Sequence, residues 1–271
     1  MSNPASDKVF AGSVPKVYEQ YLVPLIFEPY AEDLARRVAL GPCTRVLEIA
    51  AGTGVVTRKL DSVLPKETSI VATDLNPAML AVAAEHIRSD KVRFEPADAL
   101  ALPFAEGSFD LVVCQFGLMF FPDKVKGNAE ARRILREGGH YIAVIWDRLD
   151  RNPVSQIVHD TVTDLYPEDP PSFFARTPHG YADPLQIERD MRAAGFGNVE
   201  IETVELESRP VSAADAATGL VGGSPLRNEI EERDPDGVDS AIIATTHALN
   251  RLDVNGRLDS RLSAHIVTAT K

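Results

Sequence analysis

The chain has 271 residues, with 28 Lys and Arg against 40 Asp and Glu, which gives a formal net charge of −12. Its 44% hydrophobic and 25% charged residues are typical of a globular protein with a sizeable core and exclude global disorder. The acidic balance disfavours nonspecific binding to nucleic acid or to an anionic membrane, and two cysteines are too few for a disulfide scaffold.

The first half of the chain alternates predicted helices with short apolar strands. Apolar spacing predicts a helix over 15–39, which Pro24 and Pro29 are expected to break into pieces. Strands are predicted over 45–49, 69–73, 92–95, 109–115 and 141–146, and helices over 55–64, 76–87 and 123–136, the last running into a turn at 137–139. Because the strands do not alternate clearly between apolar and polar residues, we expect a doubly wound α/β fold with a parallel sheet buried on both faces.

The second half is less regular. The proline-rich segment 150–184 shows little periodicity and is predicted to be an irregular substrate cover. A helix is predicted over 184–195, a strand over 199–206 with a bulge near Thr203, and a closing strand over 262–270. The segment 212–251 is predicted to form helical pieces inserted between the last two strands, packed as a lid. We expect one domain over 1–271, made of an N-terminal helical cover (15–39), a cofactor-binding core (40–147), the irregular cover (148–184) and C-terminal strands with the insertion (185–271).

A glycine turn follows the first predicted strand. Gly52 and Gly54 allow the backbone to approach a ligand, and the helix start after Gly54 offers free N–H groups. Asp74 ends the second strand 20 positions after Gly54, where α/β nucleotide folds place an acid that accepts both ribose hydroxyls, although it can also cap the turn at Asn76. Tight turns use glycine for structural reasons too, so the two features are more specific together than alone.

Two further acids bear on the class of cofactor. A dinucleotide fold has a third glycine three positions after the second, and this sequence has Thr57 there. It has instead Glu48 within the first strand, an anion that suits a ligand with a cationic amino group and is unsuited to a pyrophosphate. Asp98 follows the third strand, where a carboxylate can accept a hydrogen bond from an exocyclic adenine amine.

Five motifs occur in a fixed order along the chain: Glu48-x-Ala50-x-Gly52-x-Gly54, Asp74, Ala97-Asp98-Ala99, Phe109-Asp110-Leu111-Val112-Val113 and Leu135-Arg136-Glu137-Gly138-Gly139. In this order they resemble the class I S-adenosylmethionine (SAM) dependent methyltransferases, near the small-molecule branch that includes quinone-biosynthesis methyltransferases. The resemblance covers about residues 40–147, more loosely 15–39 and 184–206, and departs from the family at Ala50, where many members have glycine. It implies a Rossmann-like sheet of seven strands whose last strand, 262–270, is antiparallel and inserted beside the fifth.

The resemblance also implies a role for each matching residue. Glu48 orients the loop and the cofactor's amino group, and Asp74 holds the ribose hydroxyls. The other implied contacts are Ala50, Gly52 and Gly54 on the methionine moiety, Leu75 and Met79 on adenine, Asp98 and Ala99 at the adenine amine, and Gln115 and Phe116 at the sulfonium and the incoming substrate. Met79 can equally be core filler, and Asp110, at the other end of its strand, is expected to be structural.

The implied reaction is an in-line displacement in which the protein mainly aligns an already activated methyl group with its acceptor. The sequence shows no catalytic triad and no metal-ligand spacing among its six histidines, so we expect no metal and assign no catalytic residue. Tyr18 and Tyr21, with Phe27, Phe173 and Phe174, either form an apolar lid or simply pack the helix on the sheet. His179 is either a base or an exposed loop histidine. An apolar pocket favours a small hydrophobic or aromatic acceptor.

Two other functions stay open. An NAD(P)-dependent oxidoreductase is disfavoured by Thr57 and by the lack of a Tyr-x-x-x-Lys pair. A SAM-binding protein without catalysis stays possible, because methyl transfer leaves no obligatory catalytic residue. No apolar stretch of about 18 residues predicts a membrane span, and residues 1–9 lack a signal pattern, so we expect a cytoplasmic protein with a core thiol at Cys114, a small-molecule substrate and no nucleic-acid partner.

Overall fold

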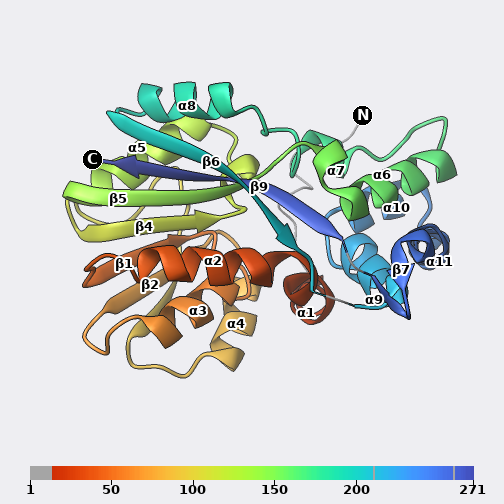
Figure 1. Ribbon diagram of the computed structural model, residues 1–271, viewed down its shortest axis with the longest axis horizontal. Coiled ribbons are helices and arrows are strands. Elements are labelled where there is room, and N and C mark those ends of the chain that lie inside the picture. The colour runs from red at the N-terminus through yellow and green to blue at the C-terminus, as the bar shows by residue number, and fades with distance from the viewer. Residues whose placement is uncertain (1–13, 210, 259) are drawn as a thin grey trace. The chain divides into compact units, whose positions relative to one another are not determined.

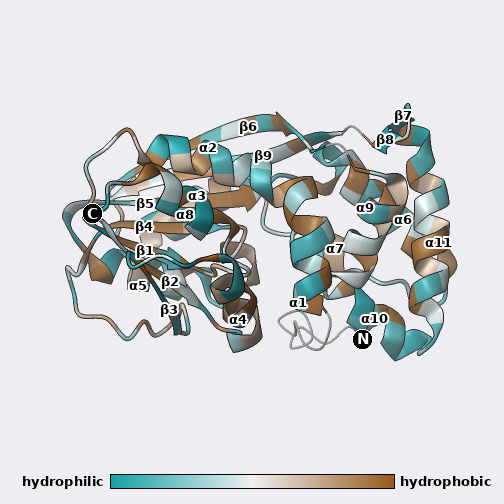
Figure 2. Cartoon of the chain, turned by 90° about the horizontal axis from the view of Figure 1, so that it is seen from below, coloured by the Kyte–Doolittle hydropathy of each residue, from teal (hydrophilic) through white to brown (hydrophobic). Residues whose placement is uncertain are grey.

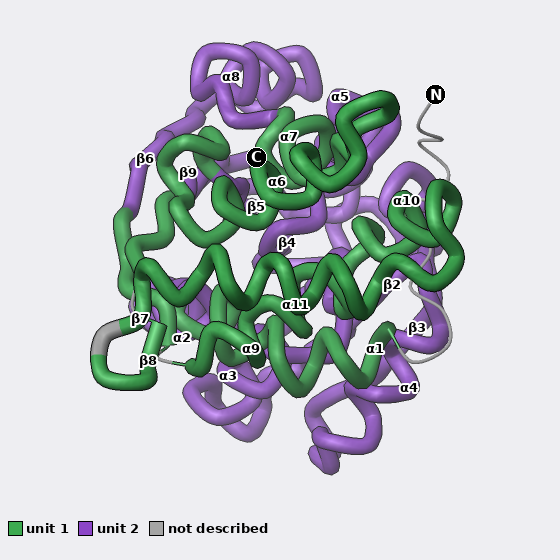
Figure 3. Tube along the Cα trace, turned by 90° about the vertical axis from the view of Figure 1, so that its right-hand side faces the viewer, with its two compact units in different colours: residues 1–29, 147–180, 205–263 green, residues 30–146, 181–204, 264–271 purple. Residues whose placement is uncertain are grey.

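Figure 1 shows the computed structural model of the chain, which describes residues 14–209, 211–258 and 260–271. The chain divides into two compact units, which are coloured separately in Figure 3. Unit 1 holds the residues up to Pro29, Asp147–Gly180 and Glu205–Ser263. Unit 2 holds Tyr30–Trp146, Tyr181–Val204 and Ala264–Lys271.

The core of unit 2 is a seven-stranded sheet in the order β3-β2-β1-β4-β5-β9-β6. Its strands are β1 (Arg45–Ile49), β2 (Ser69–Asp74), β3 (Val92–Pro96), β4 (Phe109–Gln115), β5 (Leu135–Trp146), β6 (Asn198–Glu207) and β9 (Arg261–Thr270). Strands β1 to β5 pair in parallel, and β9 pairs with β5 in the antiparallel sense. The predicted doubly wound α/β class and the place of the last strand beside the fifth are confirmed.

Strands β1 and β4 have the predicted bounds because their sequences are short, continuous apolar runs. Val46, Leu47, Val112 and Val113 are fully buried, as expected for parallel strands covered on both faces. Figure 2 shows hydrophobic residues along these central strands.

The strand order reverses between β1 and β4, which places a topological switch point at their carboxyl ends. β2 and β3 lie on one side of β1, and β4 and β5 lie on the other. The register sets Ile49 beside Thr73, and Glu48 beside Val113. The loops that carry Ala50, Asp74 and Gln115 therefore leave the sheet at one edge, where doubly wound folds bind their ligands.

The helices that flank the sheet begin at polar caps. They are α3 (Val55–Val63), α4 (Pro77–His86), α5 (Lys124–Ile134) and α8 (Pro184–Ala193), with a 3-10 turn η3 (Leu118–Phe120). The predicted start at Asn76 is confirmed, since its side chain accepts a hydrogen bond from the Ala78 N–H at 2.9 Å. Asp123 and Asp183 cap α5 and α8 in the same way.

The predicted N-terminal helix is one uninterrupted helical run. It consists of α1 (Val14–Val17), the π-helix η2 (Tyr18–Phe27) and α2 (Glu28–Val38). The expectation that Pro24 and Pro29 break the run is wrong. Pro24 lies inside the π-helix and Pro29 is the second residue of α2, and the helical backbone continues through both.

The predicted helix over 123–136 and the turn after it are partly wrong. The helix ends at Ile134, and β5 begins at Leu135 instead of Tyr141. Leu135 already has an extended backbone and pairs with Phe109 at the start of β4. A long-range strand pair therefore overrides the local helical pattern.

The expectation that 150–184 is irregular is also wrong. The segment contains helix α6 (Pro153–Leu165) and the short helix α7 (Phe173–Arg176), and the 3-10 turn η4 (Leu149–Arg151) precedes α6. Pro153 opens α6, where its missing N–H has no partner to lose. The buried face of α6 has helical spacing and consists of Val154, Ser155, Ile157, Val158 and Val162.

The insertion between β6 and β9 is built of helical pieces, as predicted. They are α9 (Ala213–Ala217), the π-helix η5 (Thr218–Gly222), α10 (Leu226–Arg233), α11 (Gly237–Leu249) and the 3-10 turn η6 (Asn250–Leu252). A small hairpin that was not predicted follows, formed by β7 (Asp253–Val254) and β8 (Arg257–Leu258). Burial along β6 changes phase at Glu202 and Thr203, where a bulge is predicted. The bulge, the lid role of the insertion and the single-domain organisation stay predictions.

Candidate functional site

The loop after β1 has an unusual backbone. Ala50, Gly52 and Gly54 have left-handed φ angles of 56°, 56° and 83°. Gly54 also lies against α4, since a Cβ atom there would come within 2.9 Å of Ile87 Cδ1 and 3.0 Å of Ala83 Cβ. Glycine adopts this left-handed φ readily and leaves room for α4. Its small size brings the amino end of α3, with its unpaired N–H groups, to the carboxyl edge of the sheet.

Glu48 is a buried carboxyl that braces this loop from within β1. Its side chain Oε2 accepts a hydrogen bond from Thr57 Oγ1 at 2.6 Å, and the residue is 2% exposed. Burial raises the pKa of Glu48 to about 8, while the Thr57 hydroxyl opposes this rise and the nearby Asp74 adds to it. Thr57, at the place of a third glycine, thus ties the first turn of α3 to β1. A contact of Glu48 with a cofactor amino group stays a prediction.

Asp74 links the end of β2 to the glycine loop. Its Oδ2 accepts the N–H of Gly52 at 2.8 Å, and its Oδ1 accepts the N–H of Asn76 at 2.8 Å. Burial raises the pKa of Asp74, and these backbone donors oppose the rise. The turn-capping role considered from the sequence is present. A carboxylate has about four acceptor positions. The Gly52 and Asn76 N–H groups therefore leave positions of Asp74 that could accept the predicted ribose hydroxyls.

The residues predicted to surround adenine lie near Asp74. Leu75 follows it directly and is 56% exposed, whereas Met79 is 4% exposed within α4. The N–H of Ala97 donates to the Asp74 carbonyl at 3.0 Å, which places the turn with Asp98 and Ala99 beside the end of β2. Asp98 is exposed and its Oδ1 accepts the N–H of Leu100 at 2.9 Å. The burial of Met79 fits core filler as well as an adenine contact, and all four roles stay predictions.

The end of β4 meets the loop after β1. Gln115 is 9% exposed, and Phe116 is 6% exposed with a left-handed φ of 55°. A Cβ atom at Gly117 would collide with the Ala50 Cβ and come within 2.9 Å of Cys114 Sγ. The predicted sulfonium-side residues are therefore brought next to the predicted methionine-side loop, at the switch point of the sheet.

Phe116 is packed into a set of buried aromatic rings that the sequence analysis missed. Its ring stacks on Trp146, with centroids 3.8 Å apart and planes 7° apart. Tyr30 packs edge-on against both rings, at centroid distances of 5.4 Å to Phe116 and 5.6 Å to Trp146. The signals in the sequence are that Trp146 is the chain's one tryptophan and that it ends a predicted strand. Contact of Phe116 with an acceptor stays a prediction.

Asp110 is structural, as expected. Its Oδ2 accepts the N–H groups of Thr44 at 2.8 Å and Arg45 at 2.9 Å, and its Oδ1 pairs with Arg136 Nε at 2.5 Å. Partial burial tends to raise the pKa of Asp110, but the Arg136 and Thr44 contacts outweigh it and lower that pKa. These contacts join the amino-terminal ends of β1, β4 and β5.

The other predicted substrate-side residues belong to unit 1. Tyr18 stacks on Phe27 with centroids 5.1 Å apart, and Tyr18 and Tyr21 are both half-buried. His179 is 8% exposed rather than solvent-exposed. Its Nδ1 donates to the Asp147 carbonyl at 2.7 Å. Burial lowers the pKa of His179 to about 4, so the ring is neutral near neutral pH.

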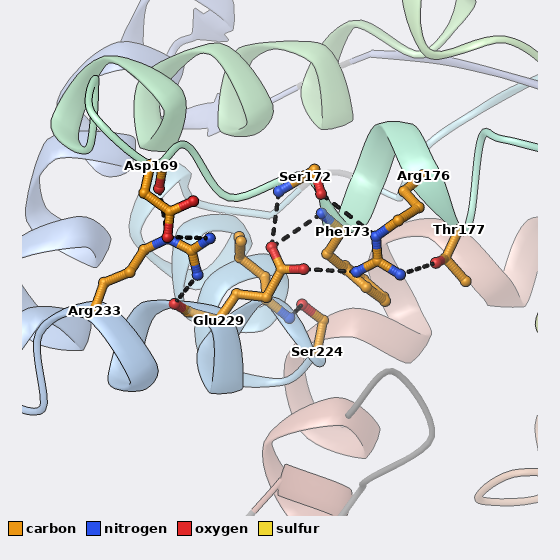
Figure 4. Close-up of polar contacts among 9 residues, drawn as sticks. Asp169, Ser172, Phe173, Arg176, Thr177, Ser224, Glu229 and Arg233 are labelled. Atoms are coloured by element: carbon orange, nitrogen blue, oxygen red, sulfur yellow. Dashed lines mark hydrogen bonds and ion pairs between the residues drawn. The ribbon is translucent and has the colours of Figure 1, made fainter. Parts of the chain in front are cut away.

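A buried polar cluster anchors the segment before His179 (Figure 4). Glu229 of α10 is fully buried, and its Oε2 accepts the N–H groups of Ser172 at 2.7 Å and Phe173 at 3.2 Å. Its Oε1 pairs with Arg176 Nη2 at 2.6 Å. Phe173 and Phe174 are 2% and 5% exposed, so they are core residues of unit 1, and the choice between an apolar lid and packing of the helix on the sheet stays a prediction.

Two surveys cover only the part of the chain that the structure describes. None of the helices there is long and apolar enough to cross a membrane. No group of three or more His, Cys, Asp and Glu side chains in that part could hold a metal ion.

The core of unit 2 matches a known domain family, and the chain has similar relatives. A family model described as a methyltransferase domain matches residues 46–139. The chain is 30% identical over 168 residues to the ubiquinone/menaquinone biosynthesis C-methyltransferase UbiE of Serratia proteamaculans, covering 57% of this chain and 67% of that protein. It is 35% identical over 119 residues to UbiE of Hahella chejuensis, covering 42% of this chain and 47% of that protein. The chain thus spans about half the length of the Hahella protein.

A solved structure shares the fold. Phosphoethanolamine N-methyltransferase 2 of Haemonchus contortus, in complex with S-adenosyl-L-methionine, superposes with a TM-score of 0.62 at 18% identity. The likeness covers 100% of this chain and 60% of that chain.

Proposed function

The chain belongs to the class I S-adenosylmethionine-dependent methyltransferases, and from this premise we propose that it transfers the methyl group of SAM to a small, apolar or aromatic acceptor. The observation that carries the proposal is the arrangement of two carboxyls around one glycine loop. Glu48 lies beneath the loop and Asp74 holds it by the Gly52 N–H at 2.8 Å. Thr57 fills the place of a third glycine and donates to Glu48 at 2.6 Å.

The residues present fit the cofactor of this family. Gly54 brings unpaired N–H groups of α3 to the edge of the sheet, and Asp74 offers acceptors for the ribose hydroxyls. Leu75 exposes an apolar side chain beside them, where adenine would cover it. We assign the cofactor to the sequence-predicted set Glu48, Ala50, Gly52, Gly54, Asp74, Leu75, Met79, Asp98, Ala99 and Gln115.

The bound cofactor supplies a methyl group that is already activated on a sulfonium. The task of the chain is then to align this methyl with the acceptor and to exclude water, for which no particular acid or base is obligatory. Should the acceptor need to lose a proton, His179 is neutral and able to accept one, although burial lowers its pKa to about 4 and makes it a weak base. Tyr18, Tyr21, Phe116 and His179 stay the sequence-based candidates for acceptor contacts.

We base the proposed class of acceptor on the aromatic side chains predicted to contact it and on the names of the relatives. The relatives' names include ubiquinone and menaquinone biosynthesis, and we propose an aromatic or quinol-type acceptor for this chain. The net charge of −12 supports a small molecule over nucleic acid. Both cysteines are free, and Cys114 is buried, which supports our proposal of a reducing, cytoplasmic compartment.

Titration calorimetry tests the cofactor. We expect binding of SAM and of S-adenosylhomocysteine (SAH), and far weaker binding of NADH, because the loop lacks the third glycine of dinucleotide folds and carries Glu48 beside it, while Asp98 suits the adenine amine. Tight NADH binding without SAM binding would establish the oxidoreductase alternative instead.

A second experiment separates an enzyme from a SAM-binding protein without catalysis. The chain is incubated with SAM carrying an isotopically labelled methyl group and a panel of phenols, quinols and small aromatic amines. Mass spectrometry then follows the label. Transfer to one of them supports the proposal, and SAM binding with no transfer to any acceptor favours the non-catalytic alternative.

A further inference from the structure

Backbone strain in unit 2 gathers at two neighbouring loops. Among the described residues, the non-glycine residues with positive φ are Ala50, Phe116 and Asn255. Asn255 lies in an Asn-Gly hairpin turn, which prefers this conformation. Ala50 and Phe116 have no such turn, and a bulky residue in this region persists only where its surroundings enforce it.

The surroundings that enforce the conformation of Phe116 are aromatic. Its ring lies flat on the Trp146 ring at 3.8 Å, and its N–H donates to the Val144 carbonyl at 2.8 Å. Tyr30 meets both rings edge-on and is fixed in turn by its hydroxyl, which donates to the Val204 carbonyl at 2.8 Å. Because the Phe116 ring is in contact with Trp146 on its face and with Tyr30 at its edge, the packing opposes rotation of the Phe116 side chain.

The position of the Phe116 backbone sets the position of the loop after β1. Gly117 follows it directly and touches Ala50 so closely that a single Cβ atom would collide. Ala50 begins the loop that leads to Gly52, whose N–H donates to Asp74 at 2.8 Å. The ring stack is therefore connected to the proposed methionine end of the site through two packed loops.

We propose that Trp146 is a positioning residue for the cofactor site: by stacking on Phe116 it holds the left-handed turn against Ala50 and so fixes the loop that binds the methionine moiety. The inference rests on the proposed function. It assigns Trp146 no contact with the cofactor. Its effect is to raise the fraction of molecules whose loop is competent to bind, and the apparent affinity scales with that fraction.

The test compares Trp146→Leu with Trp146→Phe and with a control, Phe196→Leu. Leucine keeps an apolar side chain but offers no ring face, whereas phenylalanine retains stacking. Phe196 is the control because it is 2% exposed, stacks on Tyr141 at a centroid distance of 5.9 Å and belongs to neither of the two loops. SAH binding is measured by calorimetry and unfolding by urea.

We expect Trp146→Leu to bind SAH about tenfold more weakly than wild type, and Trp146→Phe to recover most of that loss. Phe196→Leu is expected to lose stability comparably but to keep its SAH affinity. A Trp146→Leu variant that is folded and binds SAH like wild type overturns the inference alone. Equal losses of affinity in Trp146→Leu and Phe196→Leu also overturn it, because the effect is then one of general stability.

Intrinsic tryptophan fluorescence gives a second test in the wild-type protein. Trp146 is the one tryptophan of the chain, so intrinsic fluorescence comes from the ring stack. We expect SAH to change this fluorescence in the wild type, because the stack is connected to the loop. Wild type that binds no SAH at all removes the proposed function, and this inference with it. SAH binding with unchanged fluorescence in the wild type counts against the connection between stack and loop.

Discussion

Replacing Asp74 with alanine tests the best-supported position of the proposed cofactor site. In the structure the carboxylate accepts two backbone N–H groups, from Gly52 and Asn76, both at 2.8 Å. A hydrogen bond to a charged acceptor contributes about 1.5–3 kcal/mol, and losses within one side chain are not additive, so we expect the free energy of unfolding to fall by about 2–4 kcal/mol. For a chain of this size that is a melting temperature lower by about 5–15 °C.

The same substitution removes the proposed acceptor of the ribose hydroxyls. A loss of about 2–4 kcal/mol in binding free energy weakens SAH binding by roughly 30- to 1000-fold. From the sequence alone we would expect this second effect with little loss of stability, because Asn76 still caps α4. The contact with Gly52 adds the first effect, which only the structure reveals.

Asp110→Ala separates the two effects. The Asp110 carboxylate also accepts two backbone N–H groups, those of Thr44 at 2.8 Å and Arg45 at 2.9 Å, but at the amino-terminal ends of β1 and β4. We expect this variant to lose at least as much stability and to keep its SAH affinity within about threefold of wild type. Both variants are titrated at a temperature at which circular dichroism shows them folded. If Asp74→Ala also stays within about threefold, Asp74 only braces the loop and the site assignment is wrong.

Three other substitutions each test one contact. Burial raises the pKa of Glu48 to about 8 from an ordinary 4.5, so between these pH values the folded chain holds a proton that the unfolded chain releases, and the free energy of unfolding falls as pH rises. Glu48→Gln should abolish that fall. If the free energy of unfolding of the two proteins changes in parallel with pH, the expectation is wrong. Glu229→Ala removes the carboxylate that pairs with Arg176 and accepts the N–H groups of Ser172 and Phe173, and it should lower the free energy of unfolding in urea by about 2–4 kcal/mol. This is less than for a fully buried pair because Arg176 is partly exposed, and a loss under about 1 kcal/mol would mean that the cluster is not an anchor. Gly117→Ala should collide with the loop after β1 and weaken SAH binding, whereas Gly197→Ala, with nothing within 4 Å of its added Cβ, should not; equal affinities refute the contact.

The parallel sheet was predictable because each strand is specified locally. β1 and β4 are largely apolar runs, the first followed by the glycine-containing loop at 50–54 and the second ending at Gln115, and their bounds agree with the sequence prediction. The place of the last strand beside the fifth follows from the family resemblance, because no local pattern contains it. The edge at which the cofactor residues meet then followed from the topology.

The errors arise where distant contacts decide the local structure. Leu135 continues a helical pattern, but its pairing with Phe109 makes it the first residue of β5. The prolines of 150–184 predict an irregular segment, but Pro153 lies in the first turn of α6, to which proline is well suited. His179 lies in a segment without clear pattern, and its burial depends on packing within unit 1 that no local spacing records.

Within the site, the missed features are contacts between residues far apart in sequence. Thr57 was noted only as a missing glycine, yet it donates to Glu48 at 2.6 Å. The stacking of Phe116 on Trp146 joins the ends of two neighbouring strands, and Tyr30 reaches them from α2. A single sequence names the polar residues that a cofactor needs, but it does not show which side chains hold them in place.

The charges of the proposed site favour a cofactor with a cationic end over a dinucleotide. Glu48 and Asp74 lie close enough that their repulsion helps to raise the pKa of Glu48. Asp74 accepts two backbone N–H groups whereas Glu48 accepts the Thr57 hydroxyl, and burial raises the pKa of both carboxyls. The acid at Asp74 does not distinguish the cofactors, because both would present ribose hydroxyls to it. A pyrophosphate would bring further negative charge to the loop beside Glu48, whereas the ammonium and sulfonium of SAM would compensate a charge there. We therefore expect the choice between the two adenosine cofactors to depend on Glu48 and on the loop that it braces, so that a substitution at Glu48 changes both the fold and the ligand.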